Sequence, residues 1–282
     1  MPQPLAPILP TAPEVSIVTS SRRIPGLNSD AWLYGISHRE DFCRETKPWA
    51  RCVAAGEGDV YPEQEVEPLG DDDLPEFLPW TIQSTFTCTS LANYAEARKT
   101  AVETLKAKTP YAVTQELWTG AESGSVSLRD VATDISAEDA QPVEDVLADL
   151  GANFEDCAGG VTPTFHMPSR VLPRLYDTGQ VVRSGNRLLT PTGAVVIPGG
   201  PNVPGAYGPG GSSGFAESAE GEVWAYVTGP VELEFSETWE NGSGDPPAAT
   251  FARLNRSELF VSRDAIFRFP TCCVFAARVA LA

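Results

Sequence analysis

A Gly-x-Ser-x-Gly motif from Gly210 to Gly214 is the pattern in this chain that most suggests catalysis. In α/β hydrolases such a motif holds a nucleophilic serine on a tight turn between a strand and a helix, and a histidine later in the chain takes its proton. Here residues 198–214 contain seven glycines and four prolines, which favours a loop. Both histidines, His38 and His166, precede the serine. We therefore predict no hydrolase triad.

The histidines suggest no other chemistry. His166 lies in a strand-like run, which favours a core or interface position over a role in proton transfer. His38 is followed by Glu40 and Cys43, but the chain has no third histidine and no cysteine spacing typical of zinc. Near neighbours such as Asp71–Asp73 are expected by chance in an acidic chain, and no phosphate-binding glycine loop precedes a helix. We predict no catalytic residue, no metal site and no cofactor.

Six cysteines occur, at positions 43, 52, 88, 157, 272 and 273. None forms a Cys-x-x-Cys pair, and two adjacent cysteines are a poor start for a metal site. In a cytosolic protein such side chains are mostly small buried hydrophobic groups. We expect free thiols.

Acidic residues dominate the charge of the chain, which has a formal net charge of −18 and a pI near 4.4. Residues 1–160 carry 27 acids and 11 bases, whereas residues 161–282 carry 11 acids and 9 bases. Binding to phosphate needs clustered Lys and Arg, so direct affinity for nucleic acid is not expected. The dense acidic stretch from Glu57 to Glu76 is interpreted as a solvated loop, or as a surface that repels nucleic acid.

The 24 glycines and 25 prolines predict much loop or extended chain. No apolar run is long enough to span a membrane, and the proline-rich start lacks the basic segment of a signal peptide. We expect a cytoplasmic product. Residues 1–80 have weak periodicity but include Trp32, Tyr34, Trp49 and Tyr61, which favours an extended arm that becomes ordered against something else, such as a neighbouring subunit.

Two helices are predicted in the middle of the chain. The first begins near Tyr94, and Pro110 should kink or interrupt it before it reaches Gly120. The second follows a capping-box-like start at Ser136 and has apolar residues at i, i+3, i+4 and i+7 from Val143. Gly151 is expected to end it.

Strands are predicted around these helices. One is Trp80–Cys88, which alternates like a half-buried strand. The others follow residue 160, beginning with a strand at 161–167 and a hairpin of 188–190 with 194–197, with a short helix at 169–176 between them. Farther on, a strand at 222–235 is broken at Pro230, and two closing strands at 258–281 are separated at Pro270. This order indicates an α+β fold and excludes the alternating pattern of a nucleotide-binding sheet.

One basic cluster is present, formed by Arg170, Arg174, Arg183 and Arg187. Solvated side chains are the simpler interpretation. The alternative is that these arginines face the acidic half of a neighbouring subunit, since opposite patches on one surface suit a ring-forming contact.

From about residue 80 onward the chain resembles the major capsid proteins of actinobacterial tailed phages, which share the Hong Kong 97-type fold with encapsulins. The resemblance covers roughly 70 % of the chain. It depends on the order of several short pieces and not on any single motif. These pieces are Gln115–Gly120, Val146–Ala152, Pro163–Pro168, Leu188–Ile197, Val223–Val231 and Phe260–Leu281.

The resemblance implies a division of the chain into four parts. Residues 1–80 would form the N-terminal arm and extended loop. Residues 81–135 would form the first part of a peripheral domain with the long helix, residues 136–225 the axial domain, and residues 226–282 the second part of the peripheral domain with the terminal strands.

The resemblance further implies a structural protein and not an enzyme. Copies of this chain would then assemble into hexamers and pentamers of an icosahedral shell around double-stranded phage DNA. Neither sequence-specific DNA binding nor a membrane is implied. Scaffold, portal and decoration proteins are the other implied partners, and the implied location is the virion capsid, assembled in the cytoplasm of the host bacterium. With lysines only at 47, 99, 106 and 108, no motif supports the covalent crosslinking known in some members. The alternatives are an encapsulin-type compartment, a minor head protein or an unrelated enzyme.

Overall fold

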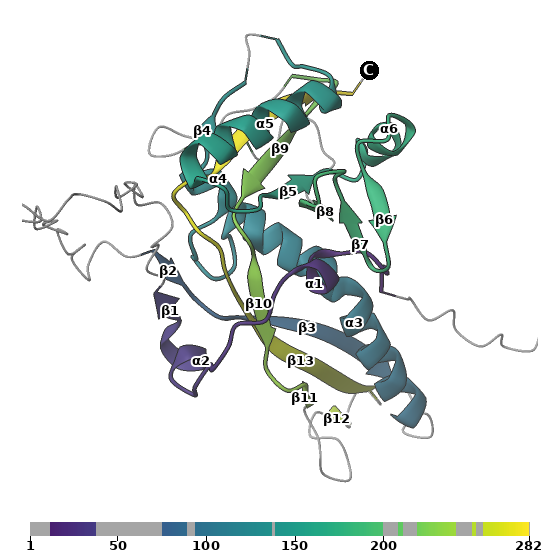
Figure 1. The fold of residues 1–282 in the computed structure, drawn as a ribbon. Coiled ribbons are helices and arrows are strands. Elements are labelled where there is room, and N and C mark those ends of the chain that lie inside the picture. The colour runs from purple at the N-terminus through teal and green to yellow at the C-terminus, as the bar shows by residue number, and fades with distance from the viewer. Residues whose placement is uncertain are drawn as a thin grey trace, which may run out of the picture.

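The computed structural model describes residues 12–37, 75–88, 94–136, 139–199, 208–210, 219–240, 250–251 and 256–281. Within these residues two sheets and two main helices make up most of the fold (Figure 1). The helices are α1 (Ile17–Ser20), α2 (Ala31–Tyr34), α3 (Tyr94–Thr119), α4 (Leu128–Val131), α5 (Val143–Ala158) and α6 (Leu172–Asp177).

The first sheet is built on one long strand, β13 (Arg256–Arg268). Strand β3 (Trp80–Cys88) pairs antiparallel along one edge of β13 over nine residues. Along the other edge β10 (Glu232–Phe235), β11 (Trp239–Glu240) and β12 (Thr250–Phe251) pair with successive parts of β13, also antiparallel. This arrangement gives a five-stranded sheet in which β13 is the only strand bonded to all the others.

The second sheet has seven strands in the order β4-β14-β9-β5-β8-β7-β6. The pairs β5–β8 and β4–β14 are parallel, and the remaining pairs are antiparallel. Its strands are β4 (Thr133–Asp134), β5 (Thr164–Met167), β6 (Val182–Ser184), β7 (Arg187–Leu189), β8 (Val195–Pro198), β9 (Glu222–Thr228) and β14 (Phe275–Ala280). A separate two-stranded pair is formed by β1 (Ile36–Ser37) and β2 (Glu76–Phe77).

The two sheets are joined by two antiparallel strands that pass from one into the other. Strand β9 lies in the second sheet and continues into β10 of the first, with the break at Gly229-Pro230. Strand β13 of the first sheet continues into β14 of the second, with the break after Phe269-Pro270. Proline has no N–H to donate to a ladder, so each strand must stop pairing at that point and can change direction. Both predicted proline breaks are confirmed.

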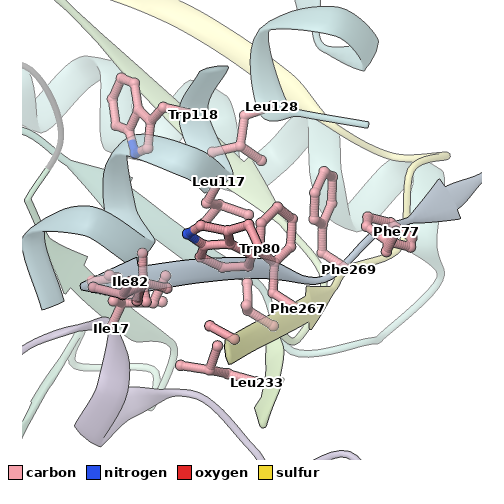
Figure 2. Packing of buried hydrophobic residues seen from close by; sticks show 14 of the residues in the cluster. Ile17, Phe77, Trp80, Ile82, Leu117, Trp118, Leu128, Leu233, Phe267 and Phe269 are labelled. Carbon is pink, nitrogen blue, oxygen red and sulfur yellow. The ribbon is translucent and has the colours of Figure 1, made fainter. Parts of the chain in front are cut away.

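Helix α3 packs against both sheets and joins them through one core. Trp118, near its C-terminal end, meets Tyr226 of β9 edge to face with ring centroids 4.7 Å apart. Farther along, Trp80 of β3 and Phe267 of β13 meet at 5.4 Å, and Phe77 meets Phe269 at the same distance. Figure 2 shows the rings of Phe77, Trp80, Phe267 and Phe269 in one cluster with Leu117 and Leu128.

A second core lies on the opposite face of the seven-stranded sheet, under α5. The alternation along β9 separates the two cores, since Val223, Ala225 and Val227 face α5. The intervening Trp224 and Tyr226 face α3. A strand buried on both faces must be apolar at nearly every position, as β9 is.

Pro110 does not interrupt α3, which runs through it for 26 residues. Proline inside a helix costs about 3 kcal/mol because a backbone hydrogen bond is lost. Leu105 and Val113, on either side, are both fully buried in the same core, and each such side chain contributes about 1.5–3 kcal/mol. Thr114 Oγ1 also donates to the Pro110 carbonyl at 2.8 Å. Packing on both sides therefore outweighs the local cost of the proline.

The predicted boundaries of the second helix are wrong at both ends. Helix α5 begins after Pro142, because the preceding segment runs alongside β14, where Ser136 Oγ accepts a hydrogen bond from the Arg278 N–H at 3.0 Å. The helix continues past Gly151 and ends at Gly159, which adopts a left-handed conformation with φ 58°. The apolar stripe continues to Phe154 and Ala158, so burial carries the helix past the glycine.

The N-terminal arm is ordered partly against its own chain. Ile17 of α1 is fully buried in the core beside α3. The Arg22 N–H donates to the Val231 carbonyl at 2.9 Å, and the Leu233 N–H donates to the Arg22 carbonyl at 2.8 Å. Residues 16–24 are therefore ordered against the body of their own chain, and contact of the arm with a neighbouring subunit stays a prediction. Trp49 and Tyr61 lie outside the described residues.

Strand pairing crosses the boundaries of the expected division of the chain, which stays a prediction. Of the two closing strands, which the expectation placed together in the peripheral part, β13 lies in the five-stranded sheet and β14 in the seven-stranded sheet. Likewise β4, within residues 81–135, pairs with β14. The proline break at Pro270 is the physical reason, because it lets the chain leave the first sheet before its end.

The two glycines of α5 provide a matched pair of stability tests. Gly151→Ala should raise the free energy of unfolding by about 0.5–1 kcal/mol, because it removes a helix-interior glycine. Its new methyl group would lie at normal contact distance, 3.5 Å, from the Phe165 ring. Gly159→Ala adds the same methyl group in open space but at positive φ, and should lower the free energy by about 1–2 kcal/mol.

Urea unfolding of the two variants and of the original chain measures both effects. A stabilising Gly159→Ala, or a strongly destabilising Gly151→Ala, would contradict this description of where α5 continues and where it ends.

Candidate subunit-contact surface

The serine motif is not built as a nucleophile elbow where the structure describes it. Residues 208–210 form no strand, and the Gly210 N–H donates to the carbonyl of Arg129 at 3.0 Å. An elbow requires a strand directly before the serine. The rest of the motif, and His38, lie outside the described residues.

His166 is a core residue, as predicted. It lies on β5 with 1 % of its surface exposed, and its Nε2 is 3.0 Å from Thr228 Oγ1 on the neighbouring strand β9. Burial lowers the pKa of His166 to about 3, because a charged imidazolium would lose its hydration there. The side chain is therefore neutral at physiological pH and is inaccessible to a substrate.

The part of the chain that the structure describes holds no group of three or more His, Cys, Asp or Glu side chains arranged for a metal ion. Among the same residues no helix combines the length and the apolar character needed to cross a bilayer.

The expectation of free thiols is wrong for three cysteines. Cys157, in the last turn of α5, forms a disulfide with Cys273, which lies between β13 and β14. Cys272 is also disulfide-bonded. Sequence spacing gave no signal for the bond between Cys157 and Cys273, because 116 residues separate the two cysteines and only the fold brings their Cα atoms to 5.7 Å.

The basic cluster is divided between internal contacts. Arg174 of α6 makes an ion pair with Glu144 of α5 at 2.8 Å. Arg183 pairs with Glu14 of the N-terminal arm, and the Arg187 side chain reaches the carbonyl of Thr19. Arg170 is exposed. Two of the four arginines therefore contact the N-terminal arm of their own chain, and a contact of the cluster with a neighbouring subunit stays a prediction. The Arg183–Glu14 pair is exposed, so its contribution to stability is small.

Several large apolar side chains project from the described surface without a partner in the core. Leu33 and Tyr34 of α2 are 71 % and 78 % exposed, Tyr111 of α3 is 67 % exposed and Trp239 of β11 is 63 % exposed. Exposed aromatic side chains are enriched at contacts between proteins. Residue type alone could not reveal these positions, because equally apolar neighbours such as Trp118 are buried.

A groove of about 670 Å³ lies beside α5. Leu147, Gly151 and Phe165 form part of its apolar lining, and Glu144 and Glu155 add carboxylates. The opposite side is formed by the turns at 160–163 and 190–194. Its lining contains no serine, cysteine or histidine that could serve as a nucleophile or a base.

Comparison with known proteins places this geometry among phage structures. No family model and no curated protein matches the chain. A solved structure from Microbacterium phage Oxtober96 matches with a TM-score of 0.54 and 12 % identity, over 99 % of this chain and 95 % of that chain. One from Gordonia phage Cozz matches with a TM-score of 0.53 and 16 % identity, over 99 % and 91 %. The capsid of Ralstonia phage GP4 matches with a TM-score of 0.50 and 9 % identity, over 99 % and 95 %.

The chain therefore has the Hong Kong 97-type fold of phage capsid proteins. Identities this low establish the fold alone. The predicted fold class, α+β of this type, is confirmed.

Lowering the pH should destabilise the folded subunit through His166. The pKa of this side chain is about 3 in the fold, whereas that of an unfolded histidine is about 6.5. Below about pH 6.5 the unfolded chain binds a proton that the folded chain does not bind until about pH 3. The free energy of unfolding should fall by up to about 1.4 kcal/mol per pH unit in this window, with no contribution above about pH 7.

Urea unfolding of dissociated subunits at about pH 7 and about pH 5 measures this effect, since most carboxylates titrate below that range. His166→Gln supplies a matched control, because its amide can still reach Thr228 but does not titrate. An equal loss of stability in both proteins would assign the effect to other groups.

Proposed function

We propose that this chain is the major capsid protein of a tailed phage, a shell subunit that assembles with copies of itself into hexamers and pentamers of an icosahedral head. The observation that carries the proposal is the agreement of the fold over 99 % of this chain with a solved phage capsid structure.

The described surface supports assembly. The exposed Leu33 and Tyr34 lie on α2, directly before the strand pair β1–β2. That pair closes the base of the segment 38–74, which we assign to the extended loop. Exposed apolar side chains are suited to contact a neighbouring subunit, where burial would stabilise the pair by about 25 cal/mol per Å².

The proposed role is structural and not catalytic. His166 is buried and neutral. The described part of the serine motif lacks the strand that an elbow needs. These features support a structural role over proton transfer by His166 or nucleophilic attack by the serine motif.

We propose a division of the chain that follows the strand pairing. The peripheral domain would contain α3 and the five-stranded sheet, and the axial domain would contain α5, α6 and the seven-stranded sheet. Compared with the boundaries 81–135, 136–225 and 226–282, this assignment moves β4 and β14 to the axial part. Residues 1–80 remain the N-terminal arm and extended loop.

The proposed location is the virion capsid, with assembly in the cytoplasm of the host bacterium. The shell would enclose double-stranded DNA without sequence-specific contacts, since a chain with a net charge of −18 has little affinity for phosphate. Scaffold, portal and decoration proteins would be its other partners.

Expression of the full chain, followed by size-exclusion chromatography and electron microscopy, tests the proposal. We expect closed particles of uniform diameter, or rings of five and six subunits that close when a scaffold is supplied. A stable single subunit at every concentration, with scaffold present, would contradict it. Closed particles that package a protein cargo in place of DNA during infection would instead indicate an encapsulin-type compartment.

Tyr34→Asp should separate assembly from folding. The ring is 78 % exposed, so the subunit should keep its unfolding midpoint. A charge buried in a subunit contact costs several kcal/mol, so the yield of closed particles should fall at least about tenfold. Tyr34→Phe retains the ring and should assemble normally. Normal assembly of Tyr34→Asp would exclude this side chain from the contact.

A further inference from the structure

The disulfide between Cys157 and Cys273 joins two parts of the fold that are 116 residues apart in the sequence. Cys157 lies in the last turn of α5, on the outer side of the seven-stranded sheet. Cys273 lies in the segment 269–274, where the chain passes from the five-stranded to the seven-stranded sheet. The bond therefore holds α5 to the segment that joins the two sheets.

The two cysteines differ in their access to solvent. Cys157 is exposed on α5, whereas Cys273 is 3 % exposed and packs in the second core. Thiol–disulfide exchange begins at a thiolate that a solute can reach, and it ends when a second thiol displaces the bound group. An exposed cysteine within bonding distance of a buried one has the arrangement that this two-step exchange needs.

We propose that Cys157 is a redox modification site that takes a small-molecule disulfide, with Cys273 as the resolving thiol. The Cys157 thiolate attacks one sulfur of a disulfide such as oxidised glutathione, forming a mixed disulfide and releasing one reduced glutathione. The Cys273 thiolate then attacks the Cys157 sulfur and releases the second glutathione. Two protein thiols are oxidised to one disulfide and one small-molecule disulfide is reduced to two thiols.

The timing of this step depends on the proposed function. A shell assembled in the host cytoplasm would be built from reduced subunits, because cytosolic thiols are kept reduced. Release of particles into an oxidising medium would then allow the exchange. The bond closes a loop across 116 positions, which removes conformational freedom from the unfolded chain. Oxidation should raise the unfolding temperature by roughly 10 °C.

The test uses the full chain purified with alkylation of free thiols during lysis, compared with chain treated with oxidised glutathione before alkylation. Trypsin gives peptide 130–170, in which Cys157 is the only cysteine, and peptide 269–278, which carries Cys272 and Cys273. We expect peptide 130–170 alkylated after lysis and linked to peptide 269–278 after oxidation. Calorimetry of both samples gives the shift in unfolding temperature.

Two variants resolve the order of the steps. Cys273→Ala keeps an apolar side chain in the core and should trap one glutathione on peptide 130–170. Cys157→Ser changes the exposed position, so it should fold normally and carry neither glutathione on that peptide nor the link.

Three results would overturn the proposal: a link already complete in chain alkylated at lysis, no link after oxidation, or a link that leaves the unfolding temperature unchanged. Each of these results can be obtained with dissociated subunits. A failure to form particles would count against the proposed function and would leave this test intact.

Discussion

The packing of α3 against both sheets is the interaction on which the rest of the structure depends. Leu105 lies in the core beside the five-stranded sheet, and Trp118 meets Tyr226 of the seven-stranded sheet. Burial of one large apolar side chain contributes a few kcal/mol, and the helix buries several on the same core. This shared core, together with the two strands that cross at Pro230 and Pro270, makes the sheets one body instead of two domains on a flexible linker. Figure 1 shows α3 running between them.

This architecture is consistent with a subunit whose task is to present surfaces in fixed relative positions. Elements α2, β11 and α3 carry the four most exposed large apolar side chains of the described surface. One buried polar pair, His166 Nε2 and Thr228 Oγ1, links two neighbouring strands. The acidic excess is compatible with enclosing a polyanion without binding it. The disulfide adds a constraint that chemistry outside the cell can set after the geometry is complete.

Local sequence was informative wherever one signal dominated. The hairpin of β7 and β8, the strand β3, and the breaks at Pro230 and Pro270 were all predicted, because turn residues and period-two alternation act over a few residues. The two misjudged positions inside helices share one cause. Pro110 and Gly151 are helix-breaking residues that the helices nevertheless accommodate, and in both cases buried side chains on either side outweigh the local preference. Ser136 is a residue type typical of a helix N-cap. Its hydroxyl instead accepts a hydrogen bond from the Arg278 N–H of β14, a strand that begins 139 residues later in the chain.

The sequence by itself therefore determined the α+β class, the order of most elements and the interior position of His166. Only the tertiary structure decided which sheet each closing strand enters, that Ile17 of the arm belongs to the core, that Arg183 binds Glu14, and that Cys157 meets Cys273. The physical reason is distance along the chain. Capping, turn and alternation signals are written in neighbouring residues, whereas these contacts join positions more than a hundred residues apart or depend on which face of a strand is covered.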